Sequence, residues 1–172
     1  MSIPISVELL KALHESVLED DPKAIKGYRQ ESMVDCCCER PMRKVYGYVP
    51  FPDAVDRAAA LMFSINAFHP FIDGCKRTSL LATYFFLLFN GIQFDITYDM
   101  IDLTIKIADR KILDEAIVSA RLRPHCRKNL VLSIYSKTIF PLIHTDIHKN
   151  ENLLALFIIP LMDSTRKIWP RA

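Results

Sequence analysis

The chain has 172 residues, 51% of them hydrophobic and 24% charged, and a formal net charge of +2. These values are close to the average of soluble globular proteins and fit one domain with a sizeable core. Residues 1–126 carry a net charge of −2 and residues 127–172 a net charge of +4, so the first part shows no nucleic-acid footprint and the second only a weak one.

The cysteines and the apolar runs indicate the compartment. The number of cysteines is odd and three are adjacent, which does not fit a disulfide framework, so we expect reduced thiols. No basic segment followed by an apolar stretch begins the chain, and the longest apolar runs, Leu153 to Met162 and Tyr84 to Phe89, are too short to span a bilayer. We therefore expect a soluble, cytoplasmic protein without membrane contact.

The first part of the chain predicts two helices joined by a turn. Ser6 begins a helical spacing of apolar residues that runs to Val17, and we expect His14 to be a partly exposed residue of this helix. A second helix is expected from Gln30 to Arg40, ended by Pro41. Its apolar stripe consists of Val34, Cys37 and Cys38. Adjacent thiols cannot all face one metal ion from a helix, so we favour buried cysteines over a metal site.

Strand-forming residues break the helical pattern between Arg43 and Phe51. Tyr46, Gly47 and Tyr48 lie in the middle of this stretch, and prolines close it. We expect a short extended segment or β-hairpin. It is either a simple connector or an exposed edge that binds an extended peptide as an added strand.

Two long helices are expected on either side of a polar loop. The first begins after Asp53 and ends near Phe68, because Pro70 forbids its continuation. The second, from Ser79 to Phe89, is apolar on nearly every side and should form the buried centre of a bundle.

The remaining elements are shorter. An extended link at residues 94–98 precedes a helix that starts at Asp99 or Asp102 and ends at Ala108, and Asp114 starts another from Glu115 to Leu122. The sequence thus predicts an all-α fold, a bundle of about six helices with a short β-hairpin.

The character of the sequence changes after residue 126, and we divide the chain into a domain of residues 1–126 and a tail of residues 127–172. His144 and His148 are four apart and would share a helix face suited to a metal ion, but no third ligand is evident, so we favour surface histidines. Three interpretations of the tail stay open: packing on the bundle, a homo-oligomer interface, or little fixed structure.

The loop between the two long helices runs from His69 to Thr78 and is suited to an anionic ligand. Gly74 at the start of a helix allows backbone N–H groups to approach an anion, which a helix N-terminus favours. Lys76 and Arg77 are both suited to phosphate. The apolar pair Phe71-Ile72 is expected to anchor the loop on the core.

Two further residues of this loop extend the chemistry. Asp73 suits Mg²⁺, which commonly uses one or two carboxylates together with substrate phosphates. His69 is placed to take a proton from an attacking hydroxyl. Together the loop residues suit transfer from a nucleoside triphosphate to a hydroxyl. The alternative is an exposed, charged corner after a broken helix.

The stretch from His69 to Arg77 resembles the signature of Fic/Doc (Fido-fold) proteins, His-Pro-Phe-x-Asp/Glu-Gly-Asn-Gly/Lys-Arg, and eight of the nine positions are compatible. The resemblance extends to Arg57–Met62, to Asn90-Gly91 and to the ending Ala120–Arg123, all similar to the Doc branch. It covers approximately residues 3–126 and leaves the tail unmatched.

The resemblance implies a role for each matched residue. His69 would be the general base and Asp73 would bind the Mg²⁺ that bridges the phosphates of ATP. The anion hole would be formed by Gly74, Cys75, Lys76 and Arg77, with Arg77 on the phosphates. The flap that aligns the target protein as an added strand would be formed by Tyr46, Gly47 and Tyr48.

Two positions bear on the reaction. Doc-like proteins have lysine at the position of Lys76 and transfer the γ-phosphoryl group, whereas adenylyl-transferring Fic enzymes usually have glycine there; AMP transfer is therefore the alternative. Cys75 replaces the asparagine of the signature, and a thiol is a weaker donor than an amide. A degenerate domain that binds nucleotide or a partner is the second alternative. Near two cations at a helix N-terminus, Cys75 is also expected to have a lowered pKa and to be oxidisable.

The resemblance also implies partners. Doc-like proteins suggest a protein substrate such as a translation factor, and a toxin–antitoxin role. The inhibitory Ser/Thr-x-x-x-Glu-Gly/Asn pattern of many family members does not occur in this sequence. A separate antitoxin protein is therefore the expected means of control.

Overall fold

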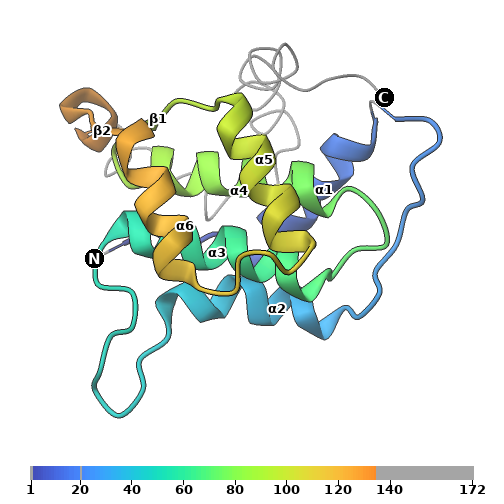
Figure 1. The fold of residues 1–172 in the computed structure, drawn as a ribbon, viewed down its shortest axis with the longest axis horizontal. Helices are drawn as coiled ribbons and strands as arrows, with labels where there is room; N and C mark the ends of the chain where they lie inside the picture. The colour runs from blue at the N-terminus through green and yellow to red at the C-terminus, as the bar shows by residue number, and fades with distance from the viewer. Residues whose placement is uncertain (1, 20, 135–172) are drawn as a thin grey trace.

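The structure is a computed structural model that describes residues 2–19 and 21–134. Within this part the predicted all-α fold is confirmed, with a two-stranded antiparallel sheet at one end (Figure 1). In chain order the elements are α1 (Val7–Glu19), α2 (Ser32–Glu39), η1 (Arg40–Met42), α3 (Ala54–Phe68), α4 (Cys75–Phe89), β1 (Ile92–Phe94), α5 (Tyr98–Ala108), α6 (Glu115–Leu122), η2 (Arg123–His125) and β2 (Cys126–Lys128), where η denotes a short 3₁₀ helix. Across these residues no helix combines the length and apolar composition needed to cross a bilayer.

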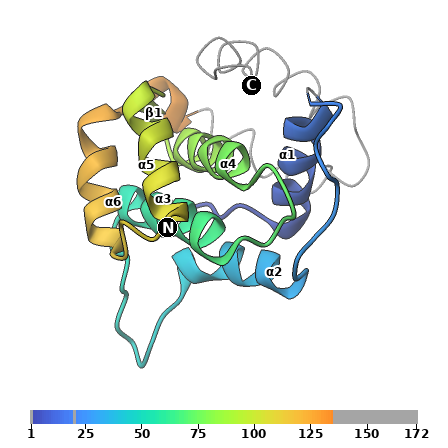
Figure 2. The same ribbon diagram turned by 45° about the vertical axis from the view of Figure 1, so that its right-hand side comes forward.

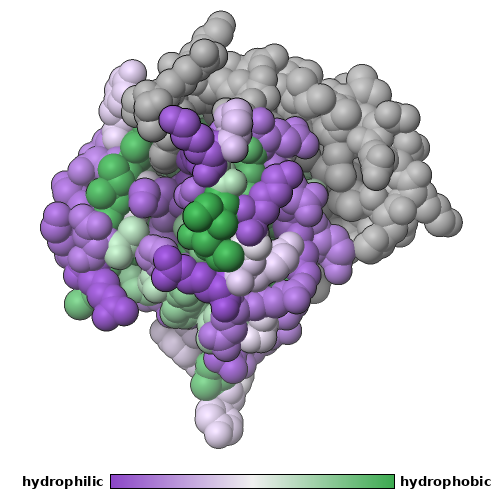
Figure 3. Space-filling view, turned by 90° about the vertical axis from the view of Figure 1, so that its right-hand side faces the viewer, coloured by the Kyte–Doolittle hydropathy of each residue, from purple (hydrophilic) through white to green (hydrophobic). Residues whose placement is uncertain are grey.

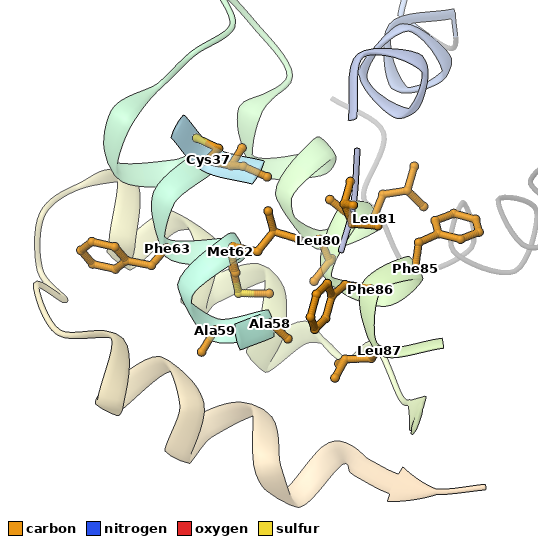
Figure 4. Close-up of a cluster of buried hydrophobic side chains, with 14 of the residues drawn as sticks. Cys37, Ala58, Ala59, Met62, Phe63, Leu80, Leu81, Phe85, Phe86 and Leu87 are labelled. Atoms are coloured by element: carbon orange, nitrogen blue, oxygen red, sulfur yellow. The ribbon is translucent and has the colours of Figure 1, made fainter. Parts of the chain in front are cut away.

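Helices α3 and α4 form the centre of the bundle, as their sequences predict. Figures 1 and 2 show α4 between α1 and α5, with α3 packed along it. Met62 of α3 faces Leu80 and Phe86 of α4 in the close-up of the core (Figure 4). All three are at most 4% exposed, so this contact removes large apolar side chains from water and fixes the two helices against each other.

Three helix starts follow from capping residues that the sequence identifies. The Asp53 carboxylate accepts from the backbone N–H groups of Val55 and Asp56, both at 2.9 Å. The Ser6 hydroxyl accepts from Leu9 N at 3.2 Å, and Asp114 accepts from Ala116 N at 2.8 Å. Each bond satisfies a donor that the first turn of a helix leaves without an internal partner.

The predicted hairpin is confirmed and is very short. Val45 and Tyr48 exchange two backbone hydrogen bonds of 2.9 Å. Tyr46 and Gly47 between them have φ of 48° and 82°, the left-handed pair that a two-residue hairpin turn requires. At its base, Arg57 Nε donates to the Phe51 carbonyl at 2.9 Å. The hairpin tip is exposed, and its base is fixed to α3.

The second predicted helix is shorter than expected. The residues from Gln30 to Arg40 were expected to form one helix, whereas α2 spans Ser32–Glu39 and the chain then tightens into η1, which contains Pro41. Val34, Cys37 and Cys38 are buried, as the apolar stripe predicts.

The small sheet was not fully predicted. β1 and β2 pair in antiparallel register with Phe94 opposite Cys126, and Asn129 N donates to Gly91 O at 2.9 Å. The boundary expected after residue 126 therefore falls inside β2, and the division into domain and tail stays a prediction. Residues 135–172, with His144 and His148 and most of the expected oligomer surface, lie outside the described residues.

Candidate active site

The loop between α3 and α4 begins with His69 in the left-handed conformation, φ 48° and ψ 59°. Pro70 has no N–H group and disfavours helical angles in the residue before it, so α3 ends here. The loop ends at Gly74, whose φ of 74° leads into the first turn of α4. It lies on the side of the bundle that also carries α1 and the segment at residues 21–31 (Figures 1 and 2). Figure 3 shows this side to be mainly hydrophilic, with hydrophobic patches among the polar residues.

Backbone hydrogen bonds attach the loop to the segment before α2. Arg29 N donates to Pro70 O at 2.8 Å, Ile72 N donates to Gly27 O at 3.0 Å, and Tyr28 and Phe71 form an antiparallel bridge. Two segments about forty residues apart in the sequence are therefore held together like short strands.

The expected anchoring by Phe71-Ile72 is half right. Phe71 is fully buried, whereas Ile72 is 40% exposed and lies over Gly27. The reason is the extended bridge, in which successive side chains point to opposite sides. Only one of two adjacent residues can then face the core.

His14 of α1 contacts the loop from the interior of the bundle. The expectation that it is partly exposed is wrong. Its ring stacks on Phe71 with centroids 3.7 Å apart, its Nδ1 is 3.0 Å from Thr78 Oγ1, and the residue is 3% exposed. Burial lowers the pKa of His14 to about 4, so the ring is neutral at pH 7. α1 packs on α4 through the face that carries Leu10 and Leu13, and His14 lies beside them.

His69, the first residue of the loop, is half-buried. Burial lowers its pKa, a hydrogen bond to the Ala67 carbonyl opposes this, and the positive charges of Arg29, Lys76 and Arg110 lower it further. The imidazole is therefore uncharged at neutral pH and able to accept a proton.

Asp73 provides an exposed carboxylate beside the helix start. One of its oxygens accepts from Gly74 N at 2.6 Å. In the part of the chain that the structure describes, no group of three or more His, Cys, Asp or Glu side chains could hold a metal ion. A single carboxylate suits Mg²⁺ only when ligand phosphates and water supply the other oxygens.

Gly74 and Cys75 are packed tightly at the start of α4. A Cβ on Gly74 would lie 3.0 Å from Leu18 Cδ2, a contact that requires Leu18 to shift, and the positive φ also favours glycine. The Cys75 thiol is buried and donates to Phe71 O at 3.4 Å. Burial raises the pKa of Cys75 despite the nearby positive charges of Arg29 and Lys76, so the expected lowered pKa is wrong.

The two cations of the loop have different surroundings. Lys76 is exposed in the first turn of α4. The Arg77 guanidinium lies 3.2 Å from an Asp21 carboxylate oxygen and donates to Val17 O at 3.4 Å. Arg77 thus joins α4 to the end of α1, and the role predicted for it on phosphates stays a prediction.

Two arginines whose positive charges lower the pKa of His69 were not identified from the sequence. Arg29 precedes α2, and Arg110 follows α5 with φ of 58°. The turn at Gly27 was the only sequence signal near Arg29, and nothing local distinguishes Arg110 from other surface arginines. Their effect on His69 depends on the packing of segments far apart in the chain.

Comparisons with known proteins agree with this geometry. The model of the Fic/DOC family matches residues 4–87, which include the loop and the helices that frame it. Toxin Doc of Mycolicibacterium smegmatis is 38% identical over 72 residues, which are 42% of this chain and 55% of that protein. The chain therefore spans about half the length of this relative. The helical bundle with its histidine-led loop is consistent with a Fido fold, and over residues 4–87 the chain is similar to the Fic/Doc family.

Proposed function

We propose that this protein transfers the γ-phosphoryl group of ATP to a Ser, Thr or Tyr hydroxyl of a protein and acts as a Doc-like toxin. The observation that carries the proposal is a neutral, half-buried His69 beside the exposed Asp73 and Lys76, in a loop that matches the Fic/Doc family model. The similarity to Toxin Doc supports the toxin role and a separate antitoxin as partner.

His69 is the proposed general base. A neutral imidazole accepts the proton of the attacking hydroxyl, and such a base contributes roughly 10²- to 10⁴-fold to the rate. The surrounding cations favour the neutral ring before the reaction and attract the phosphates of the donor.

The start of α4 is the proposed phosphate cradle. The first intrahelical bond runs from Thr78 N to Gly74 O at 2.9 Å, so the N–H groups of Cys75, Lys76 and Arg77 precede it and have no intrahelical acceptor. Asp73 would hold Mg²⁺ together with the phosphates, and a bound Mg²⁺ neutralises charge between them.

The hairpin is the proposed target-binding flap. Its exposed edge around Tyr46, Gly47 and Tyr48 suits an extended segment of the target protein, which would pair as an added strand. The Doc resemblance suggests a translation factor as the target.

Labelled ATP tests the reaction directly. The protein is incubated with a cell lysate and ATP labelled at either the α or the γ phosphate, with His69→Ala as the inactive control. We expect label to reach a lysate protein from the γ position only. Transfer from the α position alone would establish AMP transfer instead.

A degenerate binding domain is the second candidate, and Cys75 is the observation that favours it. The buried thiol donates to Phe71 O and replaces the amide of the signature. Loss of one such donor typically costs ~10²- to 10³-fold in rate. Cys75→Asn should therefore raise the transfer rate of a weakened enzyme, whereas no transfer by either protein would favour the binding domain.

A further inference from the structure

Two buried polar side chains, one from each of two neighbouring helices, hold the start of α4, residues 75–79. His14 of α1 has its Nδ1 3.0 Å from Thr78 Oγ1, and Asn66 Nδ2 of α3 donates to Ser79 Oγ at 2.7 Å. All four residues are at most 3% exposed. Bulk water therefore does not compete for either contact, and two consecutive residues of α4 are fixed to different helices.

The contact of Asn66 continues to the peptide backbone of α4. Ser79 Oγ donates its one proton to the Lys76 carbonyl at 2.8 Å, so it accepts from Asn66. The Lys76 carbonyl and the Arg77 N–H belong to one planar peptide unit, and this N–H is a donor of the proposed phosphate cradle. Asn66 also lies in the last turn of α3, three residues before His69. One side chain thus connects the helix end that precedes the proposed base with a peptide unit of the cradle.

His14 contacts the same region from α1. Its ring stacks on Phe71 with centroids 3.7 Å apart, and a Cβ on Gly74 would lie 3.4 Å from its Cε1. Together with the contact to Thr78, the imidazole touches the middle of the loop, the glycine that ends it, and the first turn of α4. A shift of this ring would therefore move the loop and the helix start together.

Stability alone does not account for polar residues at these two positions. In the part of the chain that the structure describes, three buried side-chain nitrogen or oxygen atoms have no hydrogen-bond partner: His14 Nε2, Asn66 Oδ1 and Thr97 Oγ1. A buried polar atom without a partner costs free energy that an apolar side chain of similar shape does not. Two of the three atoms belong to the residues that hold the start of α4. Local features that cost stability are expected where function requires them.

We propose that His14 and Asn66 are positioning residues for phosphoryl transfer, which hold the N–H groups at the start of α4 in the orientation that the transition state requires. The inference rests on the proposed function. Both side chains are buried and act through Thr78 and Ser79, without contact to the nucleotide. The competing interpretation is a purely structural role, in which their loss changes stability and leaves the rate of the folded protein as it was.

The variants remove each contact with little change of shape. His14→Phe keeps an aromatic ring on Phe71 and removes both ring nitrogens, and Asn66→Leu removes the amide. Thr78→Val removes the hydroxyl that His14 contacts, whereas Thr78→Ser keeps it. The matched control is Thr83→Val in the same helix, because the Thr83 hydroxyl is also buried but donates to the Ser79 carbonyl, at 2.8 Å.

Amide hydrogen exchange of the full chain tests the positioning without any need for transfer. The Ile72 N–H donates to Gly27 O at 3.0 Å and the Thr78 N–H to Gly74 O at 2.9 Å, so exchange of these amides reports opening of the loop and of the helix start. We expect His14→Phe, Asn66→Leu and Thr78→Val to speed exchange over residues 71–79 by about five- to tenfold. Thr83→Val and Thr78→Ser should change it less than about twofold.

The transfer assay with γ-labelled ATP then separates positioning from stability. We expect kcat to fall about tenfold or more in His14→Phe and in Asn66→Leu, with a smaller change in KM for ATP and with an unfolding midpoint no lower than that of the wild type. Thr78→Ser should keep the rate. Thr78→Val combined with His14→Phe should be no slower than either alone, because both remove one contact.

Two results would overturn the inference: an unchanged kcat in His14→Phe and Asn66→Leu, or an equal loss in the control Thr83→Val. If His14→Phe does not fold, the pair Thr78→Val and Thr78→Ser decides the same contact from the other helix. If the wild type transfers no label, the proposed function is wrong. The exchange rates then decide by themselves whether His14 and Asn66 hold the start of α4.

Discussion

The imidazole of His14 lies flat against the ring of Phe71, with centroids 3.7 Å apart and planes 10° from parallel. Nδ1 of the same imidazole lies 3.0 Å from Thr78 Oγ1, so one side chain of α1 contacts both the loop and the first turn of α4. Gly74 is also adjacent, since a Cβ there would be 3.4 Å from His14 Cε1. α1 therefore supports the conformation of the loop that carries His69.

Protonation of His14 should destabilise the fold. Its pKa is about 4 in the folded state against 6.5 ordinarily, so between these values the unfolded chain binds more protons than the folded one. Stability should fall as the pH drops from 6.5 to about 4, by up to about 3 kcal/mol. Denaturant titrations of the wild type and His14→Gln measure this, because glutamine does not titrate. Parallel pH dependence of the two proteins would contradict the prediction.

Alanine at Gly74 should cost more stability than alanine at Gly47. Both residues have positive φ, 74° and 82°, so both substitutions carry the left-handed strain, about 1 kcal/mol or more. A Cβ on Gly47 meets nothing within 4 Å, whereas one on Gly74 lies 3.0 Å from Leu18 Cδ2. We expect Gly74→Ala to lose about 1 kcal/mol more than Gly47→Ala in chemical denaturation. Equal losses would show that Leu18 moves aside without cost.

His69→Ala should strongly slow transfer without loss of nucleotide binding. We expect the transfer rate to fall by about 10²- to 10⁴-fold, with the free energy of unfolding nearly unchanged. The lowered pKa of His69 also predicts the pH profile: the base is lost as the pH falls through its folded pKa, so the acid limb should lie below pH 6.5. An acid limb above that value, or one that persists in His69→Ala, would assign the base elsewhere.

The cysteines should differ in their reactivity toward iodoacetamide. Burial raises the pKa of Cys75 and raises that of Cys38 to about 12, and the attacking species is the thiolate. Cys36 is only partly buried, so we expect it to be alkylated first, with Cys75 and Cys38 protected in the native protein. Mass spectrometry after brief labelling measures this, with the guanidinium-unfolded chain as the fully labelled control. Equal rates at Cys36 and Cys75 would mean that the start of α4 opens readily.

The starts of α1, α3 and α6 and the position of the loop could be predicted because their signals are local. Asp53 and Asp114 cap helices through donors two or three residues away, and Pro70 ends α3 by its own covalent structure. The apolar composition of α4 likewise permits only a buried position. The caps and the end of α3 depend on residues close together in the sequence, so they form wherever the rest of the chain lies.

The environment of the site could not be predicted in the same way. His14 is 64 residues from Thr78, Arg77 is 56 from Asp21, and β1 pairs with a strand beyond α6. These contacts exist because α1 and the segment before α2 pack against one end of α4 while the sheet forms at the other. By itself the sequence determined that most of these segments are helical and that the chain resembles the family, and it predicts the chemistry of the loop. Only the tertiary structure decided that His14 is buried and neutral, that Arg77 is paired, and that the charges of Arg29 and Arg110 act on His69, because each depends on packing between distant segments.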